Sequence, residues 1–108
     1  MLKETWMNNL TKAKCENQNA AFIEVTRGKG HILSPSKKLL WDYKKGRINW
    51  AQYVVRFKHE MNNPACAEEM RRIAEMAKTQ DVFLVCFCPP GQNCHRFLLI
   101  EMVQKLSQ

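Results

Sequence analysis

A chain of 108 residues with 45% apolar and 25% charged residues has the size and composition of one globular domain, and we expect residues 1–108 to form it. No apolar run approaches the ~20 residues of a membrane-spanning helix, and the N-terminal segment is too polar for a signal peptide. We therefore expect a cytoplasmic protein without a membrane partner. The formal net charge of +7 favours anionic partners, although a basic surface that serves solubility alone explains it equally well.

The first clear element is a strand at residues 21–26, where the sequence AFIEVT is rich in apolar and β-branched residues. It ends at a stretch with two glycines, residues 27–30, which predicts a loop. The part of the chain before this strand is ambiguous. Residues 2–6 fit an additional strand, and residues 8–14 fit a short helix.

Three helices are predicted to follow. Ser34 as cap and Pro35 as first helical residue predict a short one, which Gly46 ends. Asn49 and Asn63 are suited to cap the next two. Their apolar residues recur at helical spacing, which indicates one buried face on each helix. These faces comprise Leu39, Leu40 and Tyr43; Trp50, Tyr53, Val54, Phe57 and Met61; and Cys66, Met70, Ile73, Ala74 and Ala77.

Residues 82–87, VFLVCF, form a continuous apolar run, which is typical of a strand covered on both faces in a parallel sheet. A loop at 88–93 and a last helix from about Cys94 to Leu106 follow. The order of strand, helices, strand and helix predicts the α/β class, with a small, mainly parallel sheet and flanking helices. We expect a core that includes Phe22, Ile23, Val25, Val54, Phe57, Ile73, Leu84, Val85, Leu99 and Val103.

The motif with the most chemistry is Cys94-His95-Arg96, at the start of the last predicted helix. Open α/β sheets bind ligands there, because unpaired backbone N–H groups and the positive end of the helix dipole gather beside the carboxyl end of a strand. Cys94 is a candidate nucleophile, His95 a candidate proton carrier, and Arg96 a candidate ligand for phosphate or carboxylate. Arg27 directly follows the first clear strand and is a second candidate ligand-binding arginine.

Each of these residues also has a purely structural interpretation. Cys94 fits a small buried cap residue, and His95 fits a side chain that satisfies a backbone carbonyl. Arg96 fits an ion pair with an acidic residue such as Glu101, and Arg27 fits a solvated loop position. The three adjacent residues after a strand and a Pro-Pro-Gly loop favour an anion site over these alternatives.

The cysteine cluster also invites a metal interpretation. Cys86, Cys88, Cys94 and His95 offer the thiolate and imidazole ligands that zinc prefers. Cys86 nevertheless lies in a strongly apolar run, and paired Cys-x2-Cys spacing is missing. We therefore expect no metal and no cofactor. Seven residues separate Cys88 from Arg96, and nine separate Cys86 from it, so the Cys-x5-Arg loop of tyrosine phosphatases is excluded too.

These residues give the chain a resemblance to the small-protein branch of domain-of-unknown-function family 488, found in bacteria and archaea. The match covers nearly the whole sequence and implies a Rossmann-like α/β fold without a settled activity. Cys88 departs from the pattern, since the family usually has glutamate there. The matching residues are Arg27, Pro35, Ser36, Leu39, Leu40, Asp42, Tyr43, Lys44, Gly46, Ile48, Trp50, Tyr53, Cys86, Cys94, His95 and Arg96.

Taken together, the sequence favours a small enzyme or binding domain for a phosphorylated or nucleotide-like anion, held by Arg96 with help from Arg27. Cys94 or His95 would carry out any chemistry. The main alternative is a nucleic-acid-associated module that contacts phosphates through the basic segment 37–47. A third interpretation is a metal-stabilised interaction domain.

Overall fold

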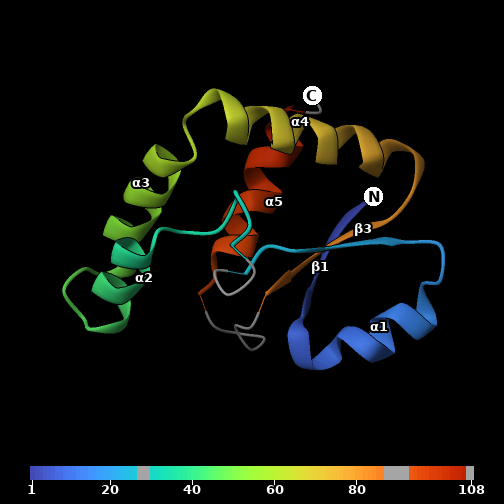
Figure 1. Cartoon of the computed structure of the whole chain (residues 1–108), viewed down its shortest axis with the longest axis horizontal. Coiled ribbons are helices and arrows are strands. Elements are labelled where there is room, and N and C mark those ends of the chain that lie inside the picture. Colours follow the sequence, from blue (N-terminus) through green and yellow to red (C-terminus); the bar gives the residue numbers. More distant parts are fainter. Residues whose placement is uncertain (27–29, 87–92, 107–108) are drawn as a thin grey trace.

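The computed structural model describes residues 1–26, 30–86 and 93–106. Its centre is a three-stranded parallel sheet in the order β1-β3-β2, which confirms the predicted α/β class (Figure 1). The central strand is paired on both sides with residues in register, Leu2 and Ala21 lying opposite Val82.

The strands are β1 (Leu2–Trp6), β2 (Ala21–Glu24) and β3 (Val82–Cys86). The ambiguous beginning of the sequence therefore contributes an edge strand. Every residue of β3 is buried, as its continuous apolar run predicts.

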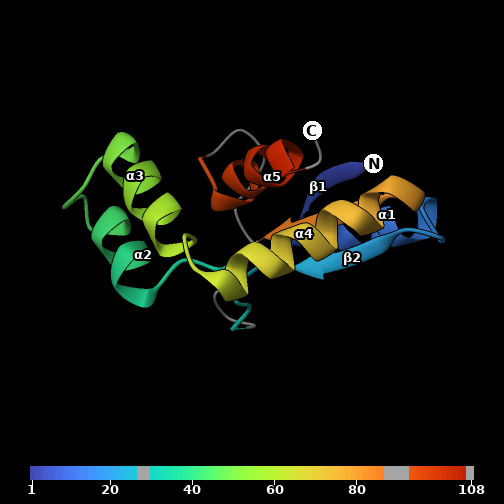
Figure 2. The ribbon, with the colours of Figure 1, turned by 90° about the horizontal axis from the view of Figure 1, so that it is seen from above.

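Among the described residues the helical segments are the short 3-10 turn η1 (Met7–Asn9), α1 (Leu10–Glu16), α2 (Lys37–Lys44), α3 (Trp50–Glu60), α4 (Pro64–Thr79) and α5 (His95–Leu106). Helices α4 and α5 pack against each other and against the sheet. Helices α2 and α3 form a hairpin on the side toward which β2 and β3 point (Figures 1 and 2). None of the helices in the described part of the chain is long and apolar enough to cross a membrane.

The predicted cap of α2 was wrong by two residues. The Oγ of Ser36 accepts the hydrogen bond from the backbone N–H of Leu39 at 3.1 Å, and so Ser36 is the cap. Ser34 instead donates its hydroxyl to the carbonyl of His31, which makes a turn before the helix. Pro35 consequently lies outside α2. A serine stands on each side of this proline, and the second of the two, not the predicted first, caps the helix.

The starts of α3 and α4 follow their predicted signals, whereas the short helix expected at residues 8–14 begins only at Leu10 and extends to Glu16. Asn49 accepts from the N–H of Gln52 while the Gln52 side chain accepts from the N–H of Asn49, a complete capping box for α3. Asn63 caps α4 by accepting from the N–H of Cys66. Gly46 ends the α2 segment with a φ of 76°, a left-handed conformation that glycine adopts without strain.

Seven of the ten predicted core residues are buried, namely Val25, Phe57, Ile73, Leu84, Val85, Leu99 and Val103. Phe22, Ile23 and Val54 are only partly buried. For Phe22 and Ile23 the reason is that β2 is an edge strand, with intermediate burial along its whole length. Val54 lies on α3, whose main neighbour is α2 rather than the sheet.

Candidate functional site

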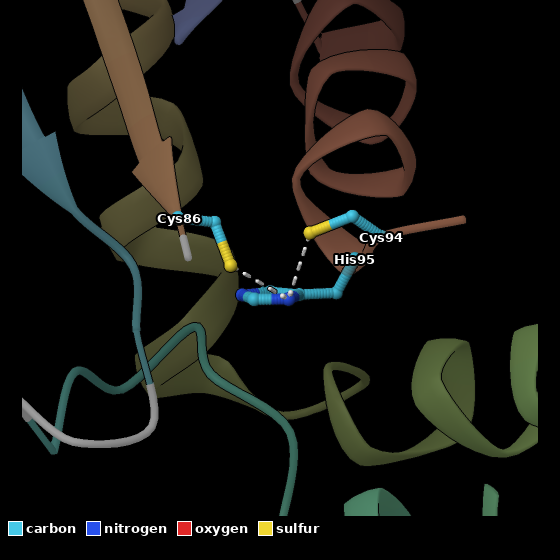
Figure 3. A group of neighbouring side chains, drawn as sticks. All are labelled: Cys86, Cys94 and His95. Carbon is cyan, nitrogen blue, oxygen red and sulfur yellow. Dashed lines mark hydrogen bonds between the residues drawn. The ribbon is translucent and has the colours of Figure 1, made fainter. Parts of the chain in front are cut away.

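Three side chains converge where β3 ends and α5 begins (Figure 3). Cys86 is the last residue of β3, Cys94 directly precedes α5, and His95 is its first residue. The Nδ1 atom of His95 lies 3.7 Å from the Cys94 sulfur and 3.8 Å from the Cys86 sulfur. All three residues are buried, so this thiol–imidazole cluster lies under the surface and at the predicted end of the sheet.

The backbone directly after β2 determines which nitrogen of the imidazole carries the hydrogen. Nε2 of His95 lies 2.6 Å from the carbonyl oxygen of Val25. A carbonyl oxygen can only accept, so Nε2 carries the hydrogen and donates it. In the neutral ring the lone pair is then on Nδ1, the atom that faces both sulfurs. The structural interpretation of His95, a side chain that satisfies a backbone carbonyl, is thus confirmed, and this contact leaves Nδ1 facing the two sulfurs.

A second contact holds the ring plane. The edge of the Phe57 ring packs against the imidazole, with the centroids 5.7 Å apart and the planes at 61°. Phe57 itself is fully buried. The imidazole is therefore held by a hydrogen bond at one nitrogen and by packing on the ring, which leaves Nδ1 as its reactive atom.

Such a cluster has two kinds of chemistry. Nδ1 can accept the proton of a thiol and leave a thiolate, which is the nucleophilic form of cysteine. Alternatively, two thiolates and Nδ1 can bind a soft or borderline metal ion. Either use needs the lone pair on Nδ1, and the hydrogen bond to Val25 supplies that condition.

Arg96 lies in different surroundings from its two neighbours. Its Nε donates to Oε2 of Glu4 at 2.6 Å, and its side chain is only 1% exposed. Its guanidinium also lies over the ring of Phe97, 4.8 Å from the centroid. The ion pair that the sequence allowed is therefore present, but the partner is Glu4 of β1, whereas Glu101 pairs with Lys105. Arg96 joins α5 to β1, and much of its charge is balanced internally.

Two cavities flank the start of α5. The first has a volume of about 350 Å³, lies at the end of β1 and is lined by Glu4, Thr5, Trp6, Asn8, Asn9 and Arg96. The second, about 170 Å³, lies between α2, α3 and α5 and is lined by Leu40, Tyr43, Lys44, Trp50, Tyr53, Asn93, Cys94 and His95. We call the second the aromatic cavity. It brings Cys94 and His95 to one hollow, while Arg96 belongs to the other.

Sequence reasoning missed several of these partners. Glu4, the partner of Arg96, lies in a segment whose secondary structure the sequence left ambiguous. The partner of His95 is the backbone carbonyl of Val25, and a backbone contact does not depend on the type of residue. The sequence assigned Tyr43 to the buried face of its helix and Lys44 to the basic segment 37–47, and it placed neither at the site. Arg27, the second predicted ligand-binding arginine, lies outside the described residues.

The fold and the cluster define a class: an α/β protein with a buried thiol–imidazole centre between a parallel strand and the following helix. The profile of the DUF488-N3a family, described as the active DUF488-N3 subclade, matches residues 29–107. The chain therefore belongs to this family, which confirms the resemblance seen in the sequence. No curated protein and no solved structure matches the chain. The matched region contains the whole cluster, whereas Glu4 and Val25 precede it.

Proposed function

We propose that the protein is a small thiol-dependent enzyme that acts on a phosphorylated or nucleotide-like anion, with Cys94 as nucleophile and His95 as its base. The observation that carries this proposal is the lone pair of His95 Nδ1, held toward the Cys94 sulfur at 3.7 Å by the hydrogen bond from Nε2 to Val25. Membership of a subclade described as active supports it.

Cys94 is preferred to Cys86 because of its position. Cys94 and His95 both line the aromatic cavity, where a substrate has room, and Cys86 is not among the described residues that line it. Cys86 ends a strand whose five residues are all buried. We assign Cys86 the role of a buried neighbour that packs beside the imidazole, 3.8 Å from Nδ1, and limits its movement.

The proposed chemistry balances without a further reagent. The Cys94 thiol gives its proton to Nδ1, and the thiolate attacks the electrophilic carbon or phosphorus of the substrate. The leaving group takes the proton back from the imidazolium, and a covalent cysteine intermediate remains. Water then releases the product and restores the thiol.

Three features favour an anionic substrate. The exposed Lys44 lines the aromatic cavity, the helix dipole of α5 places positive charge at its first turn, and the net charge is +7. Arg96 contributes less directly than its position in the motif suggests, because Glu4 already accepts from it. A role of Arg27 in holding the anion stays a prediction.

Alkylation tests the proposal directly. Iodoacetamide labelling at pH 7, read by peptide mass spectrometry, should modify Cys94 at least about tenfold faster than Cys66, because the thiolate is the reactive form and Nδ1 of His95 lies beside the Cys94 sulfur to accept its proton. Cys66 is a matched control because it is equally buried. Changing His95 to Asn should slow the labelling of Cys94 and leave that of the exposed Cys15 unchanged. Equal labelling of Cys94 and Cys66 in the native protein would refute the nucleophile assignment.

A metal centre is the second candidate, and the geometry of the cluster favours it specifically. The three ligand atoms lie within 4.8 Å of one another. Tetrahedral zinc separates a nitrogen and a sulfur ligand by about 3.6 Å, close to the 3.7 and 3.8 Å found here. Zinc binding would also use the hydrogen bond of Nε2 to a carbonyl, a common partner of a ligating histidine.

Elemental analysis of protein purified without chelator separates the two candidates. The enzyme proposal expects far less than one metal ion per chain and no change in melting temperature on chelation. A stoichiometric metal whose removal unfolds the protein would establish the metal centre instead.

A further inference from the structure

We infer that the aromatic cavity binds a planar heteroaromatic ring, so that the substrate is a nucleotide rather than a simple phosphate ester. This inference rests on the proposed function, because it places the ring beside Cys94 and His95. The cavity has a volume of about 170 Å³. Engineered cavities of about 150 Å³ accept a benzene ring, so the space suits one ring system with part of it open to solvent.

Aromatic side chains form the wall of this cavity in a fixed arrangement. Trp50 stacks on Tyr53 with centroids 4.8 Å apart and planes at 15°. Tyr43 is tilted against both, at 58° to Trp50 and 53° to Tyr53. Trp50 and Tyr43 are only partly buried, so they keep accessible surface in the cavity, whereas Tyr53 is buried behind them. Aromatic side chains presented in this way are a common surface for nucleobase stacking.

The helical spacing of Trp50, Tyr53 and Phe57 predicts one buried face, and the structure divides the three. Phe57 is in the core against His95, and Tyr53 stacks on it at 6.0 Å. Trp50 lies at the outer end of this row and lines the cavity. The row thus connects the surface that would hold the ring to the imidazole that would act on the substrate.

The polar residues of the cavity complement an anionic nucleotide. The exposed Lys44 offers a cation, and the exposed Asn93 offers an amide, which lies 3.5 Å from the Tyr43 hydroxyl. An amide can donate to and accept from the edge of a base. Lys44 is placed to pair with a phosphate group. The aromatic wall would contribute affinity only for a ligand that also carries a ring.

Charged contacts hold the two helices that form the wall. Asp42 of α2 accepts from Arg56 of α3 at 2.9 Å and from Arg47 of the connecting turn at 3.1 Å. Helices α2 and α3 therefore keep their spacing without a ligand. Because the side chains of the wall are already ordered, binding a ring costs little additional conformational entropy.

The test measures binding of four nucleoside 5′-monophosphates to the full chain by calorimetry, with ribose 5-phosphate and inorganic phosphate as probes without a base. We expect at least one nucleotide to bind at least about tenfold more tightly than ribose 5-phosphate, since stacking on an aromatic side chain contributes affinity of that order. Equal affinity for ribose 5-phosphate and all four nucleotides, or no binding of any nucleotide, would overturn the inference.

Three tryptophan variants test where the ring binds. Trp50→Ala should weaken nucleotide binding at least about tenfold. Trp50→Phe should retain most of it and shows that the fold is intact. Trp41→Ala is the matched control, because Trp41 is an exposed tryptophan of α2 that lies under Lys45 and outside the cavity. Equal losses in the Trp50→Ala and Trp41→Ala variants would contradict the assignment.

The two proposals can fail separately. A chain whose Cys94 is reactive while every nucleotide fails to bind would lose only the ligand assignment. A chain that binds nucleotides through Trp50 while Cys94 labels no faster than Cys66 would lose only the enzyme.

Discussion

On one side of the first turn of α5, Cys94 and His95 meet the aromatic side chains of α2 and α3. On the other side, Arg96 meets the polar end of β1 through Glu4. The first side is a thiol–imidazole cluster beside a small cavity, and the second is a buried ion pair beside a larger polar cavity. Three consecutive residues thus contribute to two unlike environments.

Helix geometry explains the division. Successive residues of an α-helix point about 100° apart, so His95 and Arg96 cannot face the same wall. His95 turns toward Val25 and Phe57, while Arg96 turns toward β1. A short motif interpreted as one site can therefore have one half beside a cavity and the other half in a buried ion pair, and the contacts of each half make separate predictions.

The largest loss of stability should follow from truncating Phe57, the core residue that packs against His95. Phe57 is fully buried between Tyr53 and His95. Phe57→Ala should lower the free energy of unfolding by about 3–5 kcal/mol, the usual range for a large aromatic residue in a core. Reversible urea unfolding measures it. Val55→Ala on the exposed face of α3 is the control and should change stability by about 0.5 kcal/mol or less. A loss below about 1 kcal/mol for Phe57→Ala would mean that this side is loosely packed.

The second largest loss of stability is expected from breaking the ion pair between Arg96 and Glu4 of β1. Glu4→Ala removes the acceptor of Arg96, whose side chain is 1% exposed, and should lower stability by about 1.5–3 kcal/mol, the range for a hydrogen bond to a charged group. Glu101→Ala breaks the exposed Glu101–Lys105 pair and should cost about 0.5 kcal/mol or less. A double-mutant cycle with Arg96→Met isolates the coupling of Glu4 and Arg96. Zero coupling would leave Arg96 available as the anion ligand that the sequence predicted.

The sequence predicted where the Cys94-His95-Arg96 motif lies in the fold, but not that its residues face two different environments. The apolar run of β3 and the breaker-rich loop after it placed the motif at the end of a parallel strand, and helix periodicity placed α3 and α4. These signals are local. Glu4 and the Val25 carbonyl reach the motif across 92 and 70 residues of sequence, and nothing local encodes such pairings.

The aromatic cavity illustrates a further limit. Tyr43 and Trp50 occupy positions that a helical pattern assigns to the core, and both do pack on Tyr53. Whether such a residue is fully buried or lines a cavity depends on which side chains of the neighbouring helix pack against it. Here that neighbour is the start of α5, with Asn93, Cys94 and His95. Only the assembled fold distinguishes the two cases.

A smaller effect is expected at the clamp between α2 and α3. The hydrogen bond from Arg56, followed by the one from Arg47, holds the pKa of Asp42 below its ordinary value. The carboxylate therefore stabilises the fold above pH 3.8, and this contribution is lost as the pH falls through the lower pKa of the folded state. Asp42→Asn should reduce the melting temperature at pH 7 by less than Glu4→Ala does, and the gap to the native chain should close in acid.

Asp81 provides the comparison for that measurement. Its pKa is lowered mainly by its hydrogen bond with Lys3, at the opposite end of the sheet from the aromatic cavity. Asp81→Asn should show a similar acid dependence of stability without any change in nucleotide binding. Asp42→Asn should weaken nucleotide binding, because the wall of the cavity is no longer held. Identical binding by both variants would show that the clamp is irrelevant to the cavity.

The smallest effect on stability should come from protonation of His31 in acid. Burial, the largest cause, lowers the pKa of His31 below 6.5; Glu69 acts in the opposite direction, and the charges of Arg72 and His95 lower it further. The neutral ring has a structural use, since its Nδ1 accepts from the N–H of the buried Leu33 at 3.1 Å.

Because the folded chain holds His31 neutral, the unfolded chain binds more protons as the pH drops below about 6.5, and stability must fall with it. His31→Gln keeps an acceptor for Leu33 but cannot titrate, so its unfolding free energy should decline less between pH 7 and pH 5. Urea unfolding at pH 7, 6 and 5 measures both slopes, with His59→Gln as the control on an exposed histidine. Parallel slopes for the native chain and His31→Gln would mean that other groups cause any loss in acid. A shallower slope for His31→Gln alone would show that acid weakens the fold through the segment that leads into α2.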